Sequence, residues 1–136
     1  LSGYLALGAQ LAAAARSGEA ARLERLHGAF NFGPALASNR PVGDLVTEIL
    51  RHWPGQWEDR RDRAAVHEAS LLNLATDKAH HLLAWRPVWD FATTIAHTVQ
   101  WYRDQTADPA RTTELTQAQI RSYTRDALAL GLSWTR

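Results

Sequence analysis

Cysteine and methionine are both absent from this 136-residue chain. Without cysteine it forms neither disulfides nor thiolate metal sites, which fits a protein of the reducing cytoplasm. The formal net charge is only +1, so the sequence predicts no electrostatic attraction to nucleic acid or to an anionic membrane. The apolar run from Leu5 to Ala15 is interrupted by Gln10 and is far shorter than the roughly 20 residues that cross a bilayer. We therefore expect neither nucleic acid nor membrane as a partner.

Closely spaced glycines are also missing. A dinucleotide-binding turn places glycines two or three positions apart, so that the backbone can approach a pyrophosphate at a helix N-terminus. None of the eight glycines has another glycine at either distance. The chain on its own therefore lacks the turn that would bind NAD.

The residues that are present predict one domain of helices and short strands. The apolar content of 46% and the charged content of 21% are ordinary for a globular protein. Helical periodicity predicts five helices, at 2–16, 42–52, 77–84 and 90–104 and from Thr116 onward. Gly18 is expected to end the first helix and Thr76 to cap the third, and 19–26 is either helix or loop. Short strands are expected at 29–32, around Trp57 and at 68–74, which makes the fold class α/β.

Several short motifs follow one another in a specific order. They are Asn31-Phe32-Gly33-Pro34, His67-Glu68-Ala69, Lys78-Ala79, Trp85-x-Pro87 and Trp101-Tyr102. Together they resemble the C-terminal substrate-binding part of the sugar-nucleotide dehydratases and epimerases. These enzymes belong to the extended short-chain dehydrogenase/reductase superfamily. The first two motifs narrow the resemblance to the CDP-glucose 4,6-dehydratase family. That family usually has aspartate where Ala75 stands and glycine where Ala84 stands, so this chain departs from it at two positions.

The resemblance implies a parent enzyme that uses NAD to eliminate water from CDP-glucose. The product, CDP-4-keto-6-deoxyglucose, leads to deoxysugars of bacterial surface polysaccharides. NAD and a catalytic Tyr-x-x-x-Lys pair would lie in a preceding Rossmann domain. This chain cannot supply that pair, because Lys78 is its only lysine and Leu74 stands four positions earlier. We therefore expect residues 1–136 to be a C-terminal fragment without catalytic residues, from a cytoplasmic parent that is a homo-oligomer.

Glu68 and His67 are the first candidates for substrate binding. The resemblance aligns Glu68 with a position that contacts the nucleotide, and a carboxylate can accept hydrogen bonds from both hydroxyls of a ribose diol. The alternative is a solvated glutamate that pairs with Arg60, Arg61 or Arg63. His67 is a candidate for stacking on the nucleotide or donating to it, and the alternative is an ordinary loop histidine.

Asn31 and Arg40 are the other two candidates. In the wider superfamily the matching asparagine stands beside the substrate pocket, although Asn31 can equally hydrogen-bond the next loop. Arg40 could reach a phosphate or could remain solvated. No metal site is expected, because His-Glu-x-x-His would need a histidine where Leu71 stands. Trp85, Trp89 and Trp101 are expected in the core.

Two other functions remain open at this point. One is a fragment of a different sugar-nucleotide dehydratase or epimerase. The other is a stand-alone, non-catalytic module that binds a nucleotide or a partner protein.

Overall fold

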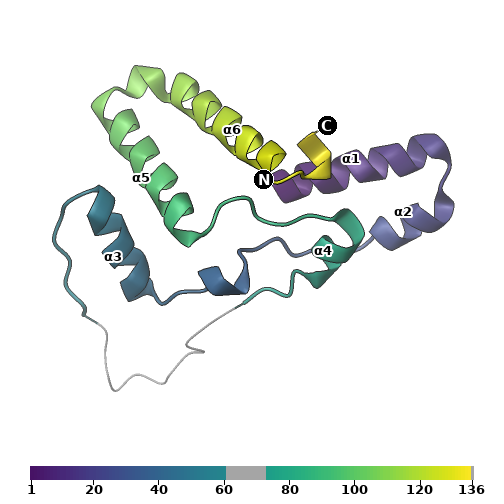
Figure 1. The fold of residues 1–136 in the computed structure, drawn as a ribbon, viewed down its shortest axis with the longest axis horizontal. Helices are drawn as coiled ribbons and strands as arrows, with labels where there is room; N and C mark the ends of the chain where they lie inside the picture. Colours follow the sequence, from purple (N-terminus) through teal and green to yellow (C-terminus); the bar gives the residue numbers. More distant parts are fainter. Residues whose placement is uncertain (61–72, 136) are drawn as a thin grey trace.

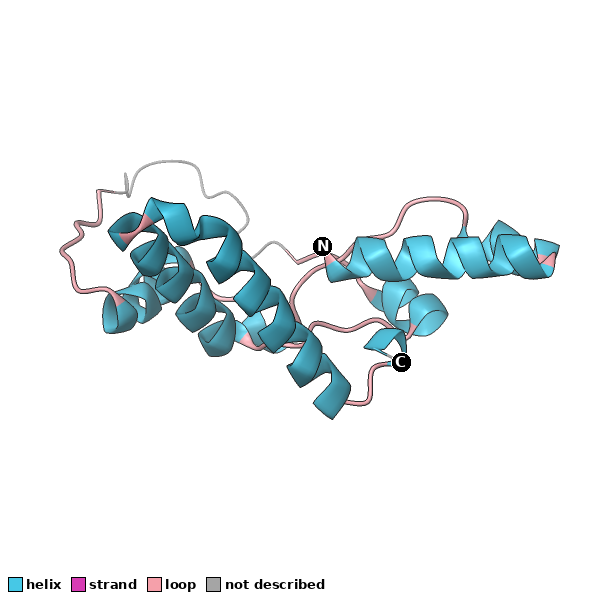
Figure 2. Cartoon of the chain, turned by 90° about the horizontal axis from the view of Figure 1, so that it is seen from above, coloured by secondary structure: helices cyan, strands magenta, loops and turns pink. Residues whose placement is uncertain are grey.

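The computed structural model describes residues 1–60 and 73–135 of the chain, and these ranges are mainly helical. The α-helices are α1 (Ser2–Ser17), α2 (Ala20–Leu26), α3 (Val42–His52), α4 (Asp77–Leu83), α5 (Phe91–Ala107) and α6 (Thr112–Ala129). Short 3₁₀ turns are η1 (Leu36–Ser38), η2 (Pro109–Arg111) and η3 (Ser133–Thr135). Figures 1 and 2 show α1, α2 and α4 gathered at one end of the molecule and α3, α5 and α6 at the other. We refer to these groups as the α1–α2–α4 unit and the α3–α5–α6 unit.

The predicted helices are confirmed, with shifts at their ends. The segment 19–26 is settled as helix α2, and Gly18 ends α1 in the left-handed conformation (φ 70°), as glycine does at helix ends. Thr76 precedes α4, but its side chain makes no capping hydrogen bond. Helix α6 begins at Thr112, earlier than predicted, because Pro109 opens η2 and η2 leads directly into α6.

The predicted strands are not found in the part of the chain that the structure describes. The segment 29–32 and the chain around Trp57 have no regular secondary structure. The third segment, 68–74, lies mostly outside the described ranges. A strand needs a neighbouring backbone to pair with. The carbonyl of Ala29 instead accepts a hydrogen bond from the Lys78 side chain, at 3.2 Å. The α/β expectation is thus corrected to a helical fold for the described residues.

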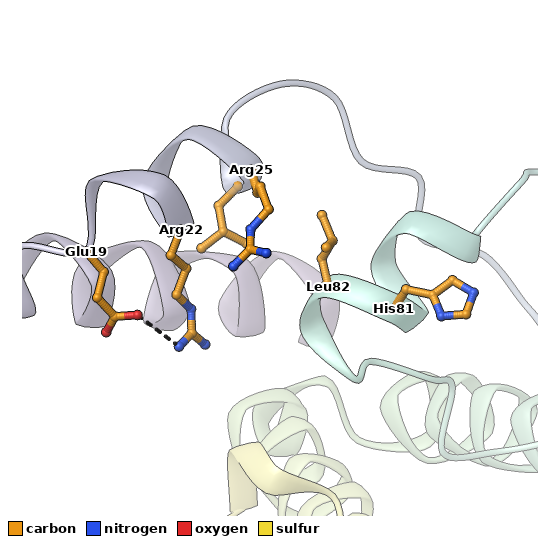
Figure 3. Close-up of a pocket in the computed structure, with 6 residues that line it drawn as sticks. Glu19, Arg22, Arg25, His81 and Leu82 are labelled. Atoms are coloured by element: carbon orange, nitrogen blue, oxygen red, sulfur yellow. Dashed lines mark ion pairs between the residues drawn. The ribbon is translucent and has the colours of Figure 1, made fainter.

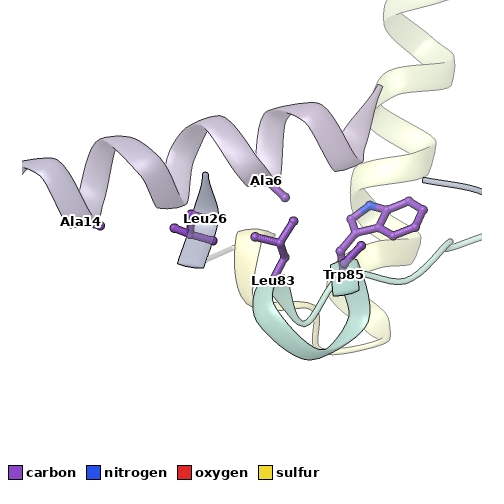
Figure 4. Close-up of a cluster of buried hydrophobic side chains, with 6 residues drawn as sticks. Ala6, Ala14, Leu26, Leu83 and Trp85 are labelled. Atoms are coloured by element: carbon purple, nitrogen blue, oxygen red, sulfur yellow. The ribbon is translucent and has the colours of Figure 1, made fainter. Parts of the chain in front are cut away.

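The main core lies in the α1–α2–α4 unit. Three of its six buried residues are alanines, which allow helix backbones to approach closely, and the others are larger (Figure 4). The six are Ala6, Ala14, Leu26, Ala79, Leu83 and Trp85. Trp85 is 6% exposed, and its ring meets Phe32 edge-on at 5.0 Å between centroids. The prediction that Trp85 is a core residue is therefore confirmed.

The α3–α5–α6 unit is packed less deeply. Its buried residues are Val99 of α5, Ala127 of α6 and, just after α6, Leu132. Trp89 and Trp101 are only half-buried. The prediction that they are core residues is therefore confirmed only in part. Trp89 stacks on His97 at 4.1 Å and donates its indole N–H to Asp126 Oδ2 at 2.9 Å.

The two units meet through polar contacts at the start of α1. The Trp85 indole N–H donates to Ser2 Oγ at 3.1 Å. The Ser2 hydroxyl also lies 3.0 Å from the Tyr123 hydroxyl of α6. One small side chain therefore links the core tryptophan of the first unit to the last helix of the second.

Candidate functional site

The segment 27–34, which carries Asn31, is held against α4 by the only lysine of the chain. Lys78 Nζ donates to the carbonyls of His27 and Ala29, at 3.5 and 3.2 Å. The same ammonium lies 4.2 Å from the centre of the Phe30 ring, in cation–π geometry. A cation that satisfies two carbonyls and faces one ring fixes the path of this segment.

Asn31 is exposed and uses its side chain to bind the next loop. Its Nδ2 donates to the carbonyl of Ala75 at 3.3 Å. This is the structural alternative that the sequence left open. It places Asn31 directly beside the residues that lead into α4.

Arg40 is exposed on the chain that follows η1. Within residues 1–60 and 73–135 no hydrogen bond or ion pair engages its guanidinium. His67 and Glu68 lie outside the described residues, so their role in binding stays a prediction. Arg60, one of the alternative partners of Glu68, forms an ion pair with Glu58 at 2.8 Å.

A polar pocket that sequence reasoning missed lies where α2 approaches α4 (Figure 3). Its volume is about 240 Å³, and its lining includes Arg22, Arg25 and His81. In Figure 3 both guanidinium groups reach below α2, while the His81 ring points outward on the far side of Leu82. Arginines at positions i and i+3 of a helix lie on one face, but their meeting with α4 depends on tertiary packing.

Arg22 is fixed by a chain of hydrogen bonds. Its guanidinium donates to Gln10 Oε1 at 3.1 Å, and Gln10 Nε2 donates to the Leu83 carbonyl at 3.0 Å. On its other side Arg22 lies 3.7 Å from Glu19. The pKa of Glu19 is lowered by a hydrogen bond from Ser17 and further by Arg22 and Arg25, so its carboxylate stays ionised. The pocket thus combines two arginines with one carboxylate, which leaves an excess of positive charge.

A larger, apolar groove lies between the first half of α1 and helix α6. Its volume is about 630 Å³. Its floor includes the aromatic side chains of Trp89, Tyr123 and Trp134. The Trp134 indole N–H is buried and has no hydrogen-bond partner among the described residues.

The part of the chain that the structure describes supports no metal site, and the sequence supports no NAD site. The described residues contain no group of three or more metal-ligand side chains. For NAD, no two glycines have the spacing that a pyrophosphate turn requires, so no step of a reaction through NAD is assigned to this chain. None of the described helices is both long enough and apolar enough to cross a membrane.

No protein-family model, curated protein or solved structure matches this chain.

Proposed function

We propose that this chain is the substrate-binding part of an NAD-dependent sugar-nucleotide dehydratase of the CDP-glucose 4,6-dehydratase type. In this proposal it covers the nucleotide of CDP-glucose, and a separate Rossmann domain carries NAD and the catalytic tyrosine. The parent enzyme would be a cytoplasmic lyase of deoxysugar biosynthesis, and this chain alone would be inactive.

One observation supports the proposal: three of the five motifs behind the resemblance, those of Asn31, Lys78 and Trp85, lie in contact with one another. Lys78 of the Lys-Ala pair holds the carbonyl of Ala29, two residues before Asn31. Asn31 binds the carbonyl of Ala75, just before α4. Trp85 of Trp-x-Pro packs on Phe32, the residue after Asn31. Residues that are up to 53 positions apart, Phe32 and Trp85, are thus in contact, as expected of motifs that serve a common purpose.

The contacts among these three motifs also leave Asn31 exposed on a fixed backbone, which suits a residue in the wall of a pocket. The backbone on both sides of it is fixed by Lys78 and by the Phe32–Trp85 contact, while the asparagine itself is exposed. A polar group on a fixed backbone costs little entropy when it binds a ligand. Arg40 is exposed further along the same connection and is a candidate for the pyrophosphate of the nucleotide.

The test is a calorimetric titration of the chain with CDP. If Glu68 holds the ribose diol, Glu68→Ala should weaken CDP binding about 10- to 100-fold, since a charged hydrogen bond is worth roughly 1.5–3 kcal/mol. Glu58→Ala is the matched control, because Glu58 pairs with Arg60 in an exposed position. An unchanged affinity in Glu68→Ala, on a variant with native circular dichroism, would contradict the proposal.

The polar pocket favours a second candidate, a non-catalytic module that binds the phosphates of a nucleotide. Its excess positive charge and the fixed guanidinium of Arg22 suit a phosphate group. The same titration separates the two functions. Loss of CDP binding in Arg25→Gln with no change in Glu68→Ala would favour the module, and the reverse result would favour the dehydratase.

A further inference from the structure

Glu19 has an unusual setting in the polar pocket between α2 and α4. It stands directly before α2, yet its side chain makes no capping hydrogen bond to that helix. Its carboxylate instead accepts a hydrogen bond from the Ser17 hydroxyl at 2.6 Å, a short distance that is typical of a hydroxyl bound to a charged acceptor. The Glu19 side chain is therefore held by the end of α1 and not by the helix that it precedes.

The same hydrogen bond leaves Glu19 at a distance from Arg22. Glu19 Oε2 lies 3.7 Å from Arg22 Nη1 (Figure 3), which is longer than the roughly 2.7–2.9 Å of a charge-assisted hydrogen bond. Within residues 1–60 and 73–135, the only hydrogen-bond acceptor of Arg22 is Gln10 Oε1, at 3.1 Å. A guanidinium has several N–H donors, and the Arg22 side chain is 41% exposed. Most of its donors are therefore available to an anion.

Arg25 supplies the second positive charge of the pocket. In the part of the chain that the structure describes, no hydrogen bond or ion pair engages its guanidinium. The hydrogen bond from Ser17 lowers the pKa of Glu19 most, and the charges of Arg22 and Arg25 lower it further. The carboxylate thus interacts with both arginines through space, and it offsets part of the attraction that they exert on any other anion.

We propose that Glu19 regulates phosphate binding in this pocket as an internal counter-ion, and that Ser17 holds its carboxylate back from Arg22. Regulation by Glu19 presupposes the second function proposed above, phosphate binding in the polar pocket, and rests on it. Two arginines and one carboxylate leave one excess positive charge, and loss of the carboxylate would leave two. A phosphate monoester carries close to two negative charges, so it is affected more strongly by this difference than a singly charged anion. When Ser17 does not hold Glu19, the carboxylate can bond to Arg22 in place of a phosphate.

The test is a titration of the full chain with inorganic phosphate, which contains neither cytidine nor glucose and is read independently of CDP binding. It is followed by NMR at about pH 8, where an ordinary imidazole is neutral and phosphate is mainly a dianion. Glu19→Gln should raise the phosphate affinity about three- to tenfold, because it removes a like charge from the pocket. Ser17→Ala should lower it about two- to fivefold, because the released carboxylate then competes for Arg22. Ser17→Thr keeps the hydroxyl and should retain the original affinity.

The matched control is Glu24→Gln, because Glu24 carries the same charge on α2 and does not line the pocket. Its effect should be clearly smaller than that of Glu19→Gln, and circular dichroism of each variant checks that the helices are intact. Equal effects of these two variants, or an unchanged affinity in either Glu19→Gln or Ser17→Ala, would overturn regulation by Glu19 while phosphate binding itself stands. Absence of phosphate binding in both the wild-type chain and Glu19→Gln, or binding that is unchanged in Arg25→Gln, would overturn the second proposed function as well.

Discussion

The two units of the fold bury their helices to different depths, although α5 and α6 are longer than any helix of the α1–α2–α4 unit. In the α1–α2–α4 unit, alanines at the helix contacts allow a continuous cluster around Leu83 and Trp85. In the α3–α5–α6 unit, α3 has a more pronounced apolar stripe than α5 or α6, yet no residue of α3 is buried. At the end of α3, Arg103 of α5 donates a hydrogen bond to the carbonyl of His52 at 2.7 Å. An amphipathic pattern therefore predicts which face turns inward, while the size of the opposing side chains decides how deeply it is buried.

The largest expected effect tests whether stability resides mainly in the first unit. Trp85→Ala should reduce the free energy of unfolding by about 3–5 kcal/mol, because it leaves a cavity between Phe32 and the α1 helix. It also removes the hydrogen bond to Ser2. Trp101→Ala should cost clearly less, since Trp101 is only half-buried and its indole N–H donates to Thr116 at 3.1 Å. Urea denaturation of both variants measures the difference. Equal losses would show that the two units contribute alike.

Two glycines of α1 test how tightly the first unit is packed, because one lies against a neighbouring ring and the other does not. A Cβ added at Gly3 would overlap the Phe32 ring, whereas a Cβ at Gly8 would meet nothing within 4 Å. Gly3→Ala should therefore destabilise the fold by about 1–3 kcal/mol through overpacking. Gly8→Ala should stabilise it by about 0.5–1 kcal/mol, because alanine is the better helix former. Thermal unfolding checks the opposite signs. A stabilised Gly3→Ala would mean that Phe32 moves aside freely.

The two units rank the other way at their helix N-termini, because a side-chain cap is formed before α5 of the second unit and not before α4 of the first. Asp90 accepts a hydrogen bond from the Thr93 backbone N–H at 2.8 Å at the start of α5. Thr76 stands at the matching place before α4 but makes no such bond. Asp90→Ala should cost about 1 kcal/mol, and Thr76→Ala should cost almost nothing. The measurement is again the urea midpoint. A larger loss in Thr76→Ala than in Asp90→Ala would contradict this ranking.

Local signals predicted the helices well because they need only neighbours along the chain. Spacing of apolar residues and Gly18 were sufficient for α1 and its end. Ala84 follows α4 in the left-handed conformation (φ 50°) that glycine usually takes at this place. The strand predictions failed because a strand needs a partner that can lie far away along the chain. The segment 29–32 has a strand-like sequence, but its bonding partners are the side chain of Lys78 and the ring of Trp85.

The candidate site could be predicted only where one residue type implies one chemistry. For Asn31, the predicted hydrogen bond to the next loop is confirmed by its contact with the Ala75 carbonyl, while its place beside a substrate pocket stays a prediction. The polar pocket was not foreseen, because Arg22 and His81 are 59 positions apart. Only the packing of α2 on α4 brings them to one hollow. Pairings of this kind carry no signal in a single sequence.

The smallest expected effect concerns the hydrogen bond that orders the second unit. The pKa of Asp126 is lowered from its ordinary 3.8 by the hydrogen bond from Trp89, and further by Arg125. Because the folded pKa is lower than the unfolded one, this contact stabilises the fold above pH 3.8 and is lost as the pH falls through the folded pKa. The Trp89 indole N–H resonance should therefore titrate with a midpoint below 3.8, and in Asp126→Asn it should not. The Trp101 resonance is the internal control, because its acceptor is the hydroxyl of Thr116, which does not titrate in this range. A Trp89 midpoint at or above 3.8 would mean that the Asp126 carboxylate is not held by the indole.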